Sequence, residues 1–411
     1  MPGDLFMQKA DVLIVGGGVS GLTAAISAAR TGEHPIILEK FDQPGKKLLA
    51  TGNGRCNLIN LNSPVYFGDK DFALSVIKEN AVEVLTRFLH SIGILIRYDD
   101  QGRGYPCTFQ AASVLDALKA EAKRLGIPIL TGVQVTDVHR HSCGYSVIAN
   151  NAETYSAPRL ILSTGGAAQP RLGGNLDARR WLESLGHHFV SPSPSLTPIC
   201  TDSRSVSGLA GIRVKCRLHV WSAQKEVHRE QGELLFTENG ISGICAMQCA
   251  RYVLPGHSEI RVDLLPDLFP DADSLYQELL LRRSAFADES PPELLRGLCV
   301  PRLGYAICKQ AGLSLRGETN RDLSDPQLFS LSETLHGYRL QVTGLEGFDR
   351  AQVMAGGVFC DEIRPDNLES RLCPGLYVTG ELLNVDGDCG GYNLMFAFIT
   401  GLMAGSNGGT P

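Results

Sequence analysis

The sequence lacks a surplus of basic residues. Its 411 residues contain 38 Lys and Arg against 44 Asp and Glu, which gives a formal net charge of −6. Phosphate binding along a nucleic acid needs a cationic surplus, so this balance argues against a nucleic-acid partner. With 43% apolar residues the chain also differs from disordered segments. We therefore expect a globular protein of two or three domains.

Long apolar runs and a leader segment are missing as well. No run reaches the roughly 18 to 20 apolar residues that span a bilayer, and the longest candidate, Tyr392 to Gly405, is interrupted by glycine. The first residues, MPGDLFMQKADV, show neither the cationic start nor the apolar stretch of a secretory signal. These features predict a cytoplasmic protein without a membrane partner.

Paired cysteine motifs are absent although the chain has 12 cysteines. No CxxC occurs and no histidines cluster near the cysteines, so the sequence predicts neither a disulfide framework nor a metal site. Cys245 and Cys249 are spaced to share one helix face, and we expect buried reduced thiols there rather than a redox pair. The motifs GxSxG and HExxH and the P-loop are also missing.

A glycine-rich turn lies between a predicted strand and a predicted helix near the start of the chain. The apolar run 11–15 is typical of a buried parallel strand, and the Ala-rich segment 19–30 is typical of a helix. Between them Gly16 allows a tight turn, Gly18 lets the backbone approach a pyrophosphate, and Gly21 lets the helix pack closely on the strand. This order predicts a dinucleotide site at the helix start.

The next strand, 35–39, ends in a carboxylate at the position where a ribose acceptor is needed. Glu39 follows the last glycine of the turn by about 20 residues, as in dinucleotide-binding βαβ units. A carboxylate there disfavours the 2′-phosphate of NADP, because two anions would meet. The residues up to this point indicate FAD or NAD.

Further segments extend the pattern to both ends of the chain. Residues 133–140 and 145–149 alternate as strands of a small antiparallel meander, and strand 158–163 runs into a second glycine turn. Near the other end, 375–381 reads as a strand and turn, and 386–393 leads into an apolar helix. This is the pattern of a mononucleotide fold interrupted by a β insertion.

The ordered motifs GGGVSGL, STGG, LYVTGE and GGYN resemble the glutathione-reductase-type FAD fold. More narrowly, TGNGRCN at 51–57, GELLFTENGISG at 232–243, AQVMAGGV at 351–358 and GDCGGYNLMFAFITG at 387–401 resemble a family of bacterial NAD(P)/FAD-dependent oxidoreductases. That family includes BaiN-like and aminoacetone-oxidase-type flavoproteins. The resemblance covers essentially the whole chain. It implies an α/β protein with a Rossmann-like FAD-binding domain and inserted β-rich and helical cap domains.

The resemblance also implies which residues hold FAD. A carboxylate after the last strand, here Glu381, would hold the ribityl chain, and the start of the final helix near Asn393 and Leu394 would face the flavin. A helix start stabilises the negative charge that develops there on reduction. The predicted cofactor-binding residues are Gly16, Gly18, Gly21, Glu39, Lys40, Lys47, Gly52, Asn53, Arg55, Val135, Thr164, Gly165, Gly166, Gly380, Glu381, Gly390, Gly391, Tyr392, Asn393 and Leu394.

Two interpretations of the loop 45–60 remain open. The loop could only clamp FAD, or it could place Arg55, Cys56 or Asn57 against the reacting face of the flavin. Cys389, in the turn before the last helix, is a weaker catalytic candidate because no partner is near it in sequence. The predicted catalytic residues are Arg55, Cys56, Asn57, Glu238 and Asn239.

The middle of the chain differs in composition and predicts an inserted substrate or cap region. Residues 1–192 and 344–411 would form the FAD-binding domain, 193–266 and 320–343 a β-rich cap, and 267–319 a helical subdomain. Ser191 to Ser195, which contains two prolines, reads as a linker.

Several polar residues of this chain are candidate contacts of substrate. Glu238 and Asn239 lie in a glycine-flanked turn that could reach the flavin or merely connect two elements. Arg103, Tyr105 and the basic strand around Arg213 are further candidates. His187 and His188 are expected to form a solvated helix end rather than a catalytic pair, because no acid or nucleophile neighbours them in sequence.

The function predicted by these features is that of an FAD-dependent oxidoreductase. FAD would exchange hydride with a small organic substrate, with NADH or NADPH as a transient donor or dioxygen as acceptor. The residues do not choose between an oxidase and a reductase, although the BaiN-like resemblance favours reduction of an activated double bond. A non-catalytic redox sensor and a tRNA-modifying flavoprotein remain alternatives. The sequence indicates no oligomeric state.

Overall fold

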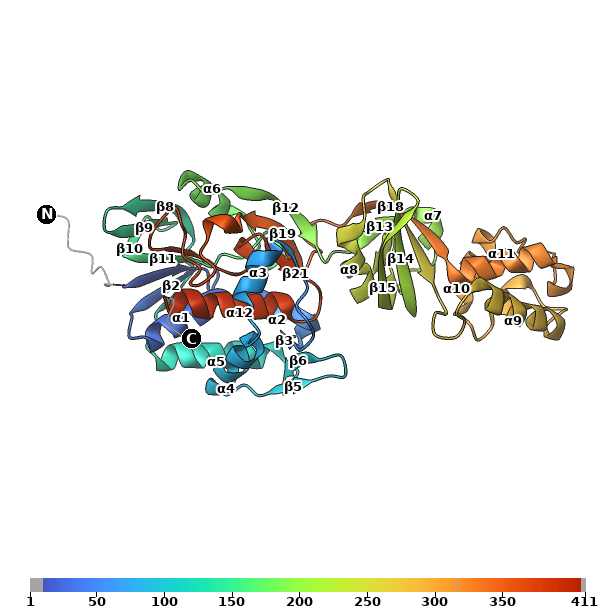
Figure 1. Cartoon of the computed structure of the whole chain (residues 1–411), viewed down its shortest axis with the longest axis horizontal. Coiled ribbons are helices and arrows are strands. Elements are labelled where there is room, and N and C mark those ends of the chain that lie inside the picture. The colour runs from blue at the N-terminus through green and yellow to red at the C-terminus, as the bar shows by residue number, and fades with distance from the viewer. Residues whose placement is uncertain (1–9, 316, 408–411) are drawn as a thin grey trace. The chain divides into compact units, whose positions relative to one another are not determined.

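The computed structural model describes residues 10–315 and 317–407, and these form two compact units with separate hydrophobic cores (Figure 1). Of the described residues, the first unit contains those up to Pro194 and from Ala351 onward, and the second contains those from Ser195 to Arg350. The two ends of the chain therefore build one unit together. The role of the second unit as a cap over the substrate stays a prediction.

A five-stranded parallel sheet forms the centre of the first unit. In spatial order its strands are β20 (Leu376–Val378), β11 (Arg159–Leu162), β1 (Val12–Val15), β2 (Pro35–Glu39) and β7 (Ile129–Thr131). Strands β1 and β2 are buried along their whole length, as parallel strands covered on both faces are. The predicted strand, helix and second strand at 11–39 are therefore confirmed.

Smaller sheets and helices surround this sheet. The predicted meander is confirmed as β8 (Val135–His141), β9 (Gly144–Ala149) and β10 (Thr154–Ala157). The other sheets pair β3 (Ile59–Asn60) and β5 (Ile96–Tyr98) with β6 (Arg103–Pro106), β4 (Tyr66–Gly68) with β21 (Val385–Gly387), and β12 (Phe189–Ser195) with β19 (Val353–Val358). The helices are α1 (Val19–Arg30), α2 (Lys46–Ala50), α3 (Lys70–Val76), α4 (Ala81–Ser91), α5 (Ala111–Arg124), α6 (Asp177–Ser184) and α12 (Tyr392–Gly405).

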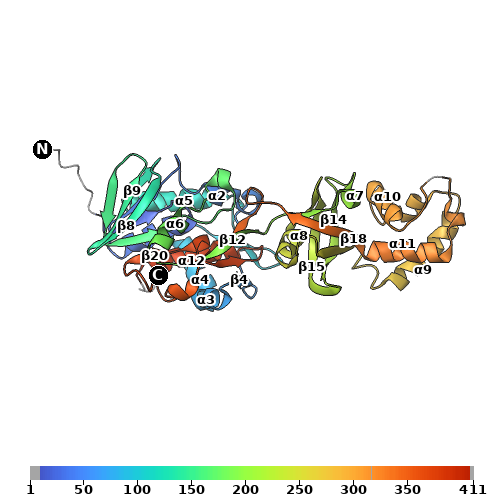
Figure 2. The same ribbon diagram turned by 90° about the horizontal axis from the view of Figure 1, so that it is seen from above.

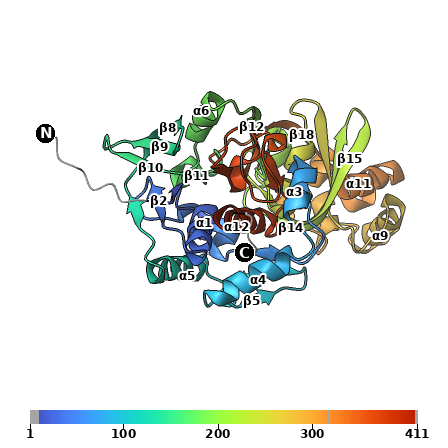
Figure 3. The same cartoon turned by 60° about the vertical axis from the view of Figure 1, so that its left-hand side comes forward.

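Helices α1 and α12, from opposite ends of the chain, lie side by side (Figure 3). Glycines of α12 form part of their contact. A Cβ atom at Gly401 would lie 2.4 Å from the carbonyl oxygen of Ser20, and one at Gly405 would lie 2.3 Å from that of Ala24. Neither position has room for a larger residue. The close packing brings the end of the chain onto the helix that follows the first glycine turn.

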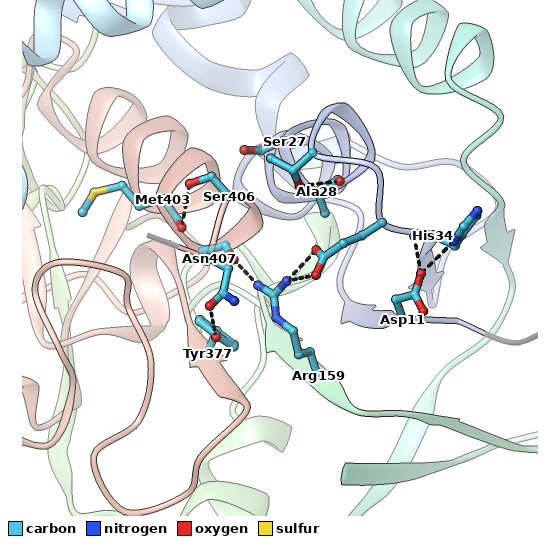
Figure 4. Close-up of polar contacts among 12 residues, drawn as sticks. Asp11, Ser27, Ala28, His34, Arg159, Tyr377, Met403, Ser406 and Asn407 are labelled. Atoms are coloured by element: carbon cyan, nitrogen blue, oxygen red, sulfur yellow. Dashed lines mark hydrogen bonds and ion pairs between the residues drawn. The ribbon is translucent and has the colours of Figure 1, made fainter. Parts of the chain in front are cut away.

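The last turn of α12 is tied to the sheet by Arg159 (Figure 4). Its guanidinium donates to the Glu33 carboxylate at 2.6 Å and to the carbonyl oxygen of Ala404 at 2.7 Å. Beside it the Tyr377 hydroxyl donates to Oδ1 of Asn407 at 2.6 Å. A cation at a helix C-terminus is favourable because the carbonyl groups there carry partial negative charge.

Replacing this guanidinium should loosen the first unit. We expect Arg159→Met to lower the stability of the unit by about 2 to 3 kcal/mol, because the change leaves Glu33 and a helix end without their partner. Urea unfolding followed by flavin fluorescence measures this shift. The control Arg87→Met removes an exposed ion pair with Glu83 and should cost at most about 1 kcal/mol. Equal midpoints for the two variants would contradict the structural role of Arg159.

The second unit contains a closed six-stranded barrel. In order around the barrel its strands are β13 (Ile199–Thr201), β16 (Gly240–Ser242), β15 (Lys225–Phe236), β14 (Arg213–Ser222), β17 (Ser258–Asp263) and β18 (Tyr338–Leu345). Its helices are α7 (Ser203–Val206), α8 (Ile244–Cys249), α9 (Ala272–Ala285), α10 (Pro301–Gln310) and α11 (Asp325–His336). Helices α9 and α11 lie side by side (Figure 2). None of the described helices of either unit is long and apolar enough to cross a lipid bilayer.

The structure differs from two expectations about this insertion. Ser191 to Ser195, expected as a linker, does contain the boundary between the two units, but it belongs to strand β12. Its prolines are tolerated because they lie in a two-stranded sheet, where no second partner strand needs their missing N–H groups. Asp325–His336, expected within a β-rich segment, is helix α11. Its start carries a capping box between Ser324 and Gln327, with a proline in the first turn.

Candidate functional site

The first glycine turn has the geometry of a dinucleotide site. Gly16 has a φ of +105°, and a Cβ atom there would lie 2.5 Å from the carbonyl oxygen of Ser163. A Cβ atom at Gly21 would lie 1.9 Å from the carbonyl oxygen of Gly16. At Gly18, in contrast, no atom lies within 4 Å of a Cβ position. Packing therefore requires glycine at positions 16 and 21, whereas Gly18 leaves open space at the start of α1.

The carboxylate of Glu39 is held beside this turn by backbone groups. It is 7% exposed, and its oxygens accept hydrogen bonds from the N–H groups of Gly17 at 2.7 Å and Phe41 at 2.9 Å. The carboxylate therefore has a fixed position at the end of β2. A ribose bound in the βαβ unit would find its acceptor there.

Removing this carboxylate should weaken the retention of FAD. We expect Glu39→Ala to raise the dissociation constant of FAD about 10- to 100-fold, because hydrogen bonds to a charged group contribute about 1.5 to 3 kcal/mol. Flavin absorbance after dialysis measures retention, and circular dichroism checks that the core stays folded. The exposed Glu79 provides the control Glu79→Ala. Unchanged flavin content in Glu39→Ala would count against the ribose role.

A second carboxylate, Glu381, connects three distant parts of the chain. It accepts hydrogen bonds from the N–H groups of Met354 at 2.8 Å and Gly166 at 3.4 Å, and it forms an ion pair with Lys47. A Cβ atom at Gly166 would lie 3.0 Å from the Glu381 carboxyl carbon. The three predicted cofactor residues Lys47, Gly166 and Glu381 are thus brought together by the fold.

Other predicted cofactor residues line the same sheet edge or lie near it. Gly380 has a φ of +64°, and its N–H donates to the Thr400 hydroxyl at 3.0 Å. Lys40 donates to the carbonyl oxygen of Gly173 at 2.8 Å, and burial lowers the pKa of Lys40. Val135 is buried at the start of β8. Thr164 and Gly165 follow β11, and the roles of all these residues toward FAD stay predictions.

The start of α12 offers backbone N–H groups rather than side chains. Gly391, with a φ of +105°, precedes the first helical residue, and Gly390 has a φ of +124°. Tyr392 is buried against Tyr66, whose hydroxyl donates to the Tyr392 carbonyl oxygen at 3.0 Å. The Asn393 amide bonds to the backbone of Gly387. The free donors at this end are therefore the first-turn N–H groups, including that of Leu394.

The loop TGNGRCN adopts an unusual backbone. Gly52, Asn53 and Cys56 have φ values of +56°, +55° and +61°. Left-handed conformations at non-glycine residues cost free energy and are concentrated at functional sites. Within the described chain, Oδ1 of Asn57 is buried without a hydrogen-bond partner. A Cβ atom added at Gly391 would lie 2.7 Å from this oxygen. An unsatisfied acceptor thus lies at the start of α12, where a bound flavin would provide a donor.

Arg55, two residues before Asn57, and Arg103 belong to the segments around this point. The Arg55 side chain is exposed, and its guanidinium forms no ion pair or hydrogen bond with a residue in 10–315 or 317–407. Arg103 donates to Asp99 at 2.8 Å, and its Cδ atom lies 4.0 Å from a Cβ position at Gly390. An exposed guanidinium without a partner, such as that of Arg55, can bind a carbonyl oxygen or an anion.

Two expectations about individual residues are wrong. Cys56 has no exposed surface and burial raises the pKa of its thiol to about 12, so it cannot meet a substrate as a thiolate. His187 is not solvated, because its ring bridges Glu362 at 2.8 Å and Ser370 at 2.9 Å inside the unit. These partners are too far away in sequence for local spacing to indicate them. His188 is exposed, as expected.

The expected burial of Cys245 and Cys249 is confirmed, whereas the catalytic candidacy of Cys389 stays untested. Cys245 and Cys249 are buried free thiols on α8, and Cys245 donates to the carbonyl oxygen of Glu233. The Sγ atom of Cys389 lies 3.9 Å from Oε1 of Gln352, outside any thiol pair of the described chain.

Glu238 and Asn239 lie in the second unit. They form the turn between β15 and β16, where the Asn239 carbonyl oxygen accepts the N–H of Thr201 at 2.9 Å. Arg213 forms an exposed ion pair with Glu233. Contact of these residues with flavin or substrate stays a prediction.

Comparison with known families gives a match over nearly the full length. Residues 10–407 match the family described as "HI0933-like protein Rossmann domain". The chain belongs to this family. The matched range contains both glycine turns, Glu39, Glu381 and the final helix, so all parts of the site lie within one family fold.

Two curated relatives extend over the same length. The chain is 35% identical over 402 residues to a 3-dehydro-bile acid delta(4,6)-reductase of Clostridium scindens, which covers 95% of this chain and 97% of that protein. It is 28% identical over 407 residues to a ribosomal RNA dihydrouridine synthase of Escherichia coli, covering 95% and 96%. Among solved structures, a 3-ketosteroid-delta4-(5alpha)-dehydrogenase from Rhodococcus jostii RHA1 matches with a TM-score of 0.51 at 16% identity, over 99% of this chain and 98% of that chain.

The family member described here is an FAD-dependent oxidoreductase with a Rossmann-type FAD-binding fold and an additional β domain. The chain's own residues fit the cofactor. One edge of the parallel sheet carries the open space at Gly18 and the fixed carboxylates of Glu39 and Glu381. The unsatisfied Asn57 oxygen lies at the start of α12. Each of these residues was predicted from the sequence, but no sequence signal indicates that the Asn57 oxygen is buried and unsatisfied.

Proposed function

We propose that this enzyme is a reductase that saturates a carbon–carbon double bond conjugated to a carbonyl group, with NADH or NADPH as the electron donor. The observation that carries the proposal is the 35% identity, over 95% of the chain, to a protein named a delta(4,6)-reductase. The name dihydrouridine synthase of the second relative also denotes the formation of a dihydro product. Both names favour reduction over oxidation by dioxygen.

When bound, FAD supplies a two-electron carrier that accepts and returns hydride. The residues of this chain hold and orient the reactants. Glu39 would bind ribose hydroxyls, the open backbone at Gly18 would accommodate the pyrophosphate, and Asn57 with the first turn of α12 would bind the polar edge of the flavin. The start of α12 stabilises an anion there by about 1 to 2 kcal/mol.

We assign the activation of the substrate to Arg55. Its guanidinium is permanently charged and has no acidic partner in the described chain, so it can donate to a carbonyl oxygen. Donation to that oxygen draws electrons away from the conjugated double bond. It also stabilises the negative charge that the oxygen gains when hydride arrives at the far carbon.

Anaerobic half-reactions test the proposal. NADH or NADPH should bleach the flavin of the purified enzyme. A conjugated carbonyl compound, tested as cyclohex-2-enone, a delta-4-3-ketosteroid and uridine, should then restore its colour faster than dioxygen does. Rapid peroxide formation in air, together with no reoxidation by any of the three compounds, would contradict a reductase.

A uracil base in RNA is a second candidate substrate. Relatives from Escherichia coli and Haemophilus influenzae, 28% and 27% identical, are both named ribosomal RNA dihydrouridine synthases. The net charge of −6 does not favour such a partner. Filter binding with bulk ribosomal RNA and transfer RNA distinguishes the two substrates. Retention that weakens steeply with salt would favour RNA, and no retention would favour a small molecule.

A further inference from the structure

One face of the small β3–β6–β5 sheet carries polar and aromatic side chains. Along β6 the residues alternate, so that Arg103 and Tyr105 point to one face and the buried Gly104 and Pro106 point to the other. Asn60 of β3 lies directly opposite Arg103 in the sheet. Residues opposite each other in neighbouring strands share a face, which places Asn60, Arg103 and Tyr105 together.

This face meets the turn that begins α12. The Asn60 amide donates to the carbonyl oxygen of Gly390 at 2.9 Å. A Cβ atom at Gly390 would lie 2.8 Å from that amide nitrogen and 4.0 Å from the Cδ atom of Arg103. The face with Tyr105 is therefore adjacent to the helix start that would receive the flavin.

The hydroxyl of Tyr105 has no hydrogen-bond partner among the described residues, in contrast to three other tyrosines of the unit. Tyr66, Tyr145 and Tyr377 each donate to a protein oxygen. Tyr105 is half-buried, and none of the described residues hydrogen-bonds to its hydroxyl. A half-buried phenol without a partner is available to a bound molecule.

The charges around Tyr105 suit a group that releases a proton. Burial is the largest influence and raises the pKa of Tyr105, so the phenol is protonated at neutral pH. The guanidinium groups of Arg103 and Arg55 act in the opposite direction and lower this pKa, while Asp99 raises it. The two arginines thus stabilise the phenolate that remains after the proton has left.

We propose that Tyr105 is the catalytic acid that protonates the substrate during double-bond reduction. This inference rests on the proposed function. A hydride delivered to the carbon far from the carbonyl would form one C–H bond there, and the π electron pair of the double bond would form the second C–H bond with the proton of the Tyr105 hydroxyl. The O–H bond of Tyr105 breaks, and water then returns the proton to the phenolate. NADH or NADPH supplies the two electrons.

The oxidative half-reaction of the holoenzyme tests this role. In Tyr105→Phe, bleaching by NADH or NADPH should keep its wild-type rate, whereas reoxidation by the three carbonyl compounds named above should fall on the order of 100-fold. The control Tyr98→Phe changes a tyrosine of β5 that lies opposite Gly104 and therefore on the other face. It should leave both rates unchanged.

Different outcomes distinguish this proposal from the proposed function. Reoxidation of Tyr105→Phe at the wild-type rate would overturn the acid role alone. A wild-type enzyme that none of the three compounds reoxidises would overturn the proposed function and the acid role with it.

A spectroscopic titration tests the charge environment without turnover. With tyrosine labelled at Cζ with ¹³C, the resonance missing in Tyr105→Phe reports the pKa of Tyr105 in the oxidised holoenzyme. This pKa should rise in Arg103→Gln, because a neighbouring positive charge is lost. An unchanged pKa would contradict stabilisation of the phenolate by Arg103.

Discussion

Gly18→Val should yield a folded protein that has lost nearly all of its FAD. The backbone at Gly18 has an ordinary φ of −75°, and no protein atom lies within 4 Å of a Cβ position there. The substitution therefore meets no protein atom at Cβ, but it fills the space through which the backbone would approach the pyrophosphate. We expect the dissociation constant of FAD to rise at least about 100-fold, equivalent to about 2.7 kcal/mol.

A matched control separates loss of FAD from a general effect of valine. Gly347, in the second unit, also has no atom within 4 Å of a Cβ position and no left-handed φ. Gly347→Val should keep its flavin. Isothermal titration of the apoproteins with FAD gives both dissociation constants, and circular dichroism monitors folding. A yellow Gly18→Val protein with wild-type affinity would refute the assigned path of the pyrophosphate.

Arg55→Met should separate the two interpretations of the TGNGRCN loop. If Arg55 binds the substrate carbonyl, the variant keeps its FAD and its bleaching by NADH or NADPH. Its kcat/KM for the carbonyl substrate should fall about 100- to 1,000-fold, as when one donor to a developing oxyanion is removed. The side chain is exposed, so its loss should cost little stability.

The control for this variant is Arg204→Met. Arg204 is an exposed arginine of the second unit, and no ion pair or hydrogen bond joins it to the rest of the described chain. The Arg204→Met enzyme should retain wild-type kinetics. An Arg55→Met enzyme that purifies without FAD would support a loop that only clamps the cofactor, and one with unchanged kcat/KM would contradict the substrate role.

Local sequence patterns predicted the parts of the fold that depend on near neighbours. The run 11–15, the spacing of Gly16, Gly18 and Gly21, and the carboxylate of Glu39 lie within one βαβ unit, where chain connectivity alone brings them together. The apolar helix after GGYN was predictable for the same reason. Gly16 and Gly21 also have the steric roles expected from their spacing, because a Cβ atom at either position would collide with a backbone oxygen.

Contacts between distant segments could not be predicted in this way. The ion pair of Lys47 with Glu381 joins residues that no local pattern connects, and the same is true of His187 with Glu362. The complete burial of Cys56 depends on packing around its left-handed backbone, which the motif TGNGRCN does not reveal. The two prolines of β12 suggest an irregular linker from sequence alone. The segment is nevertheless a strand, because proline is compatible with the edge of a two-stranded sheet.

The helical part of the second unit shows a different cause of error. Asp325–His336 follows a serine with a glutamine three residues later and a proline in the first turn, which together are a helix-start signal. The local sequence therefore indicates a helix at this position, although the strand Tyr338–Leu345 follows directly after it.

The flavin content of the purified chain is the most direct test of the central claim, that FAD is held between the first glycine turn and the start of α12. Heat-released flavin from the wild-type protein, or from apoprotein mixed with FAD, should be FAD at one molecule per chain. Gly18→Val should carry almost none under the same conditions. A colourless wild-type protein that does not bind added FAD would contradict the claim.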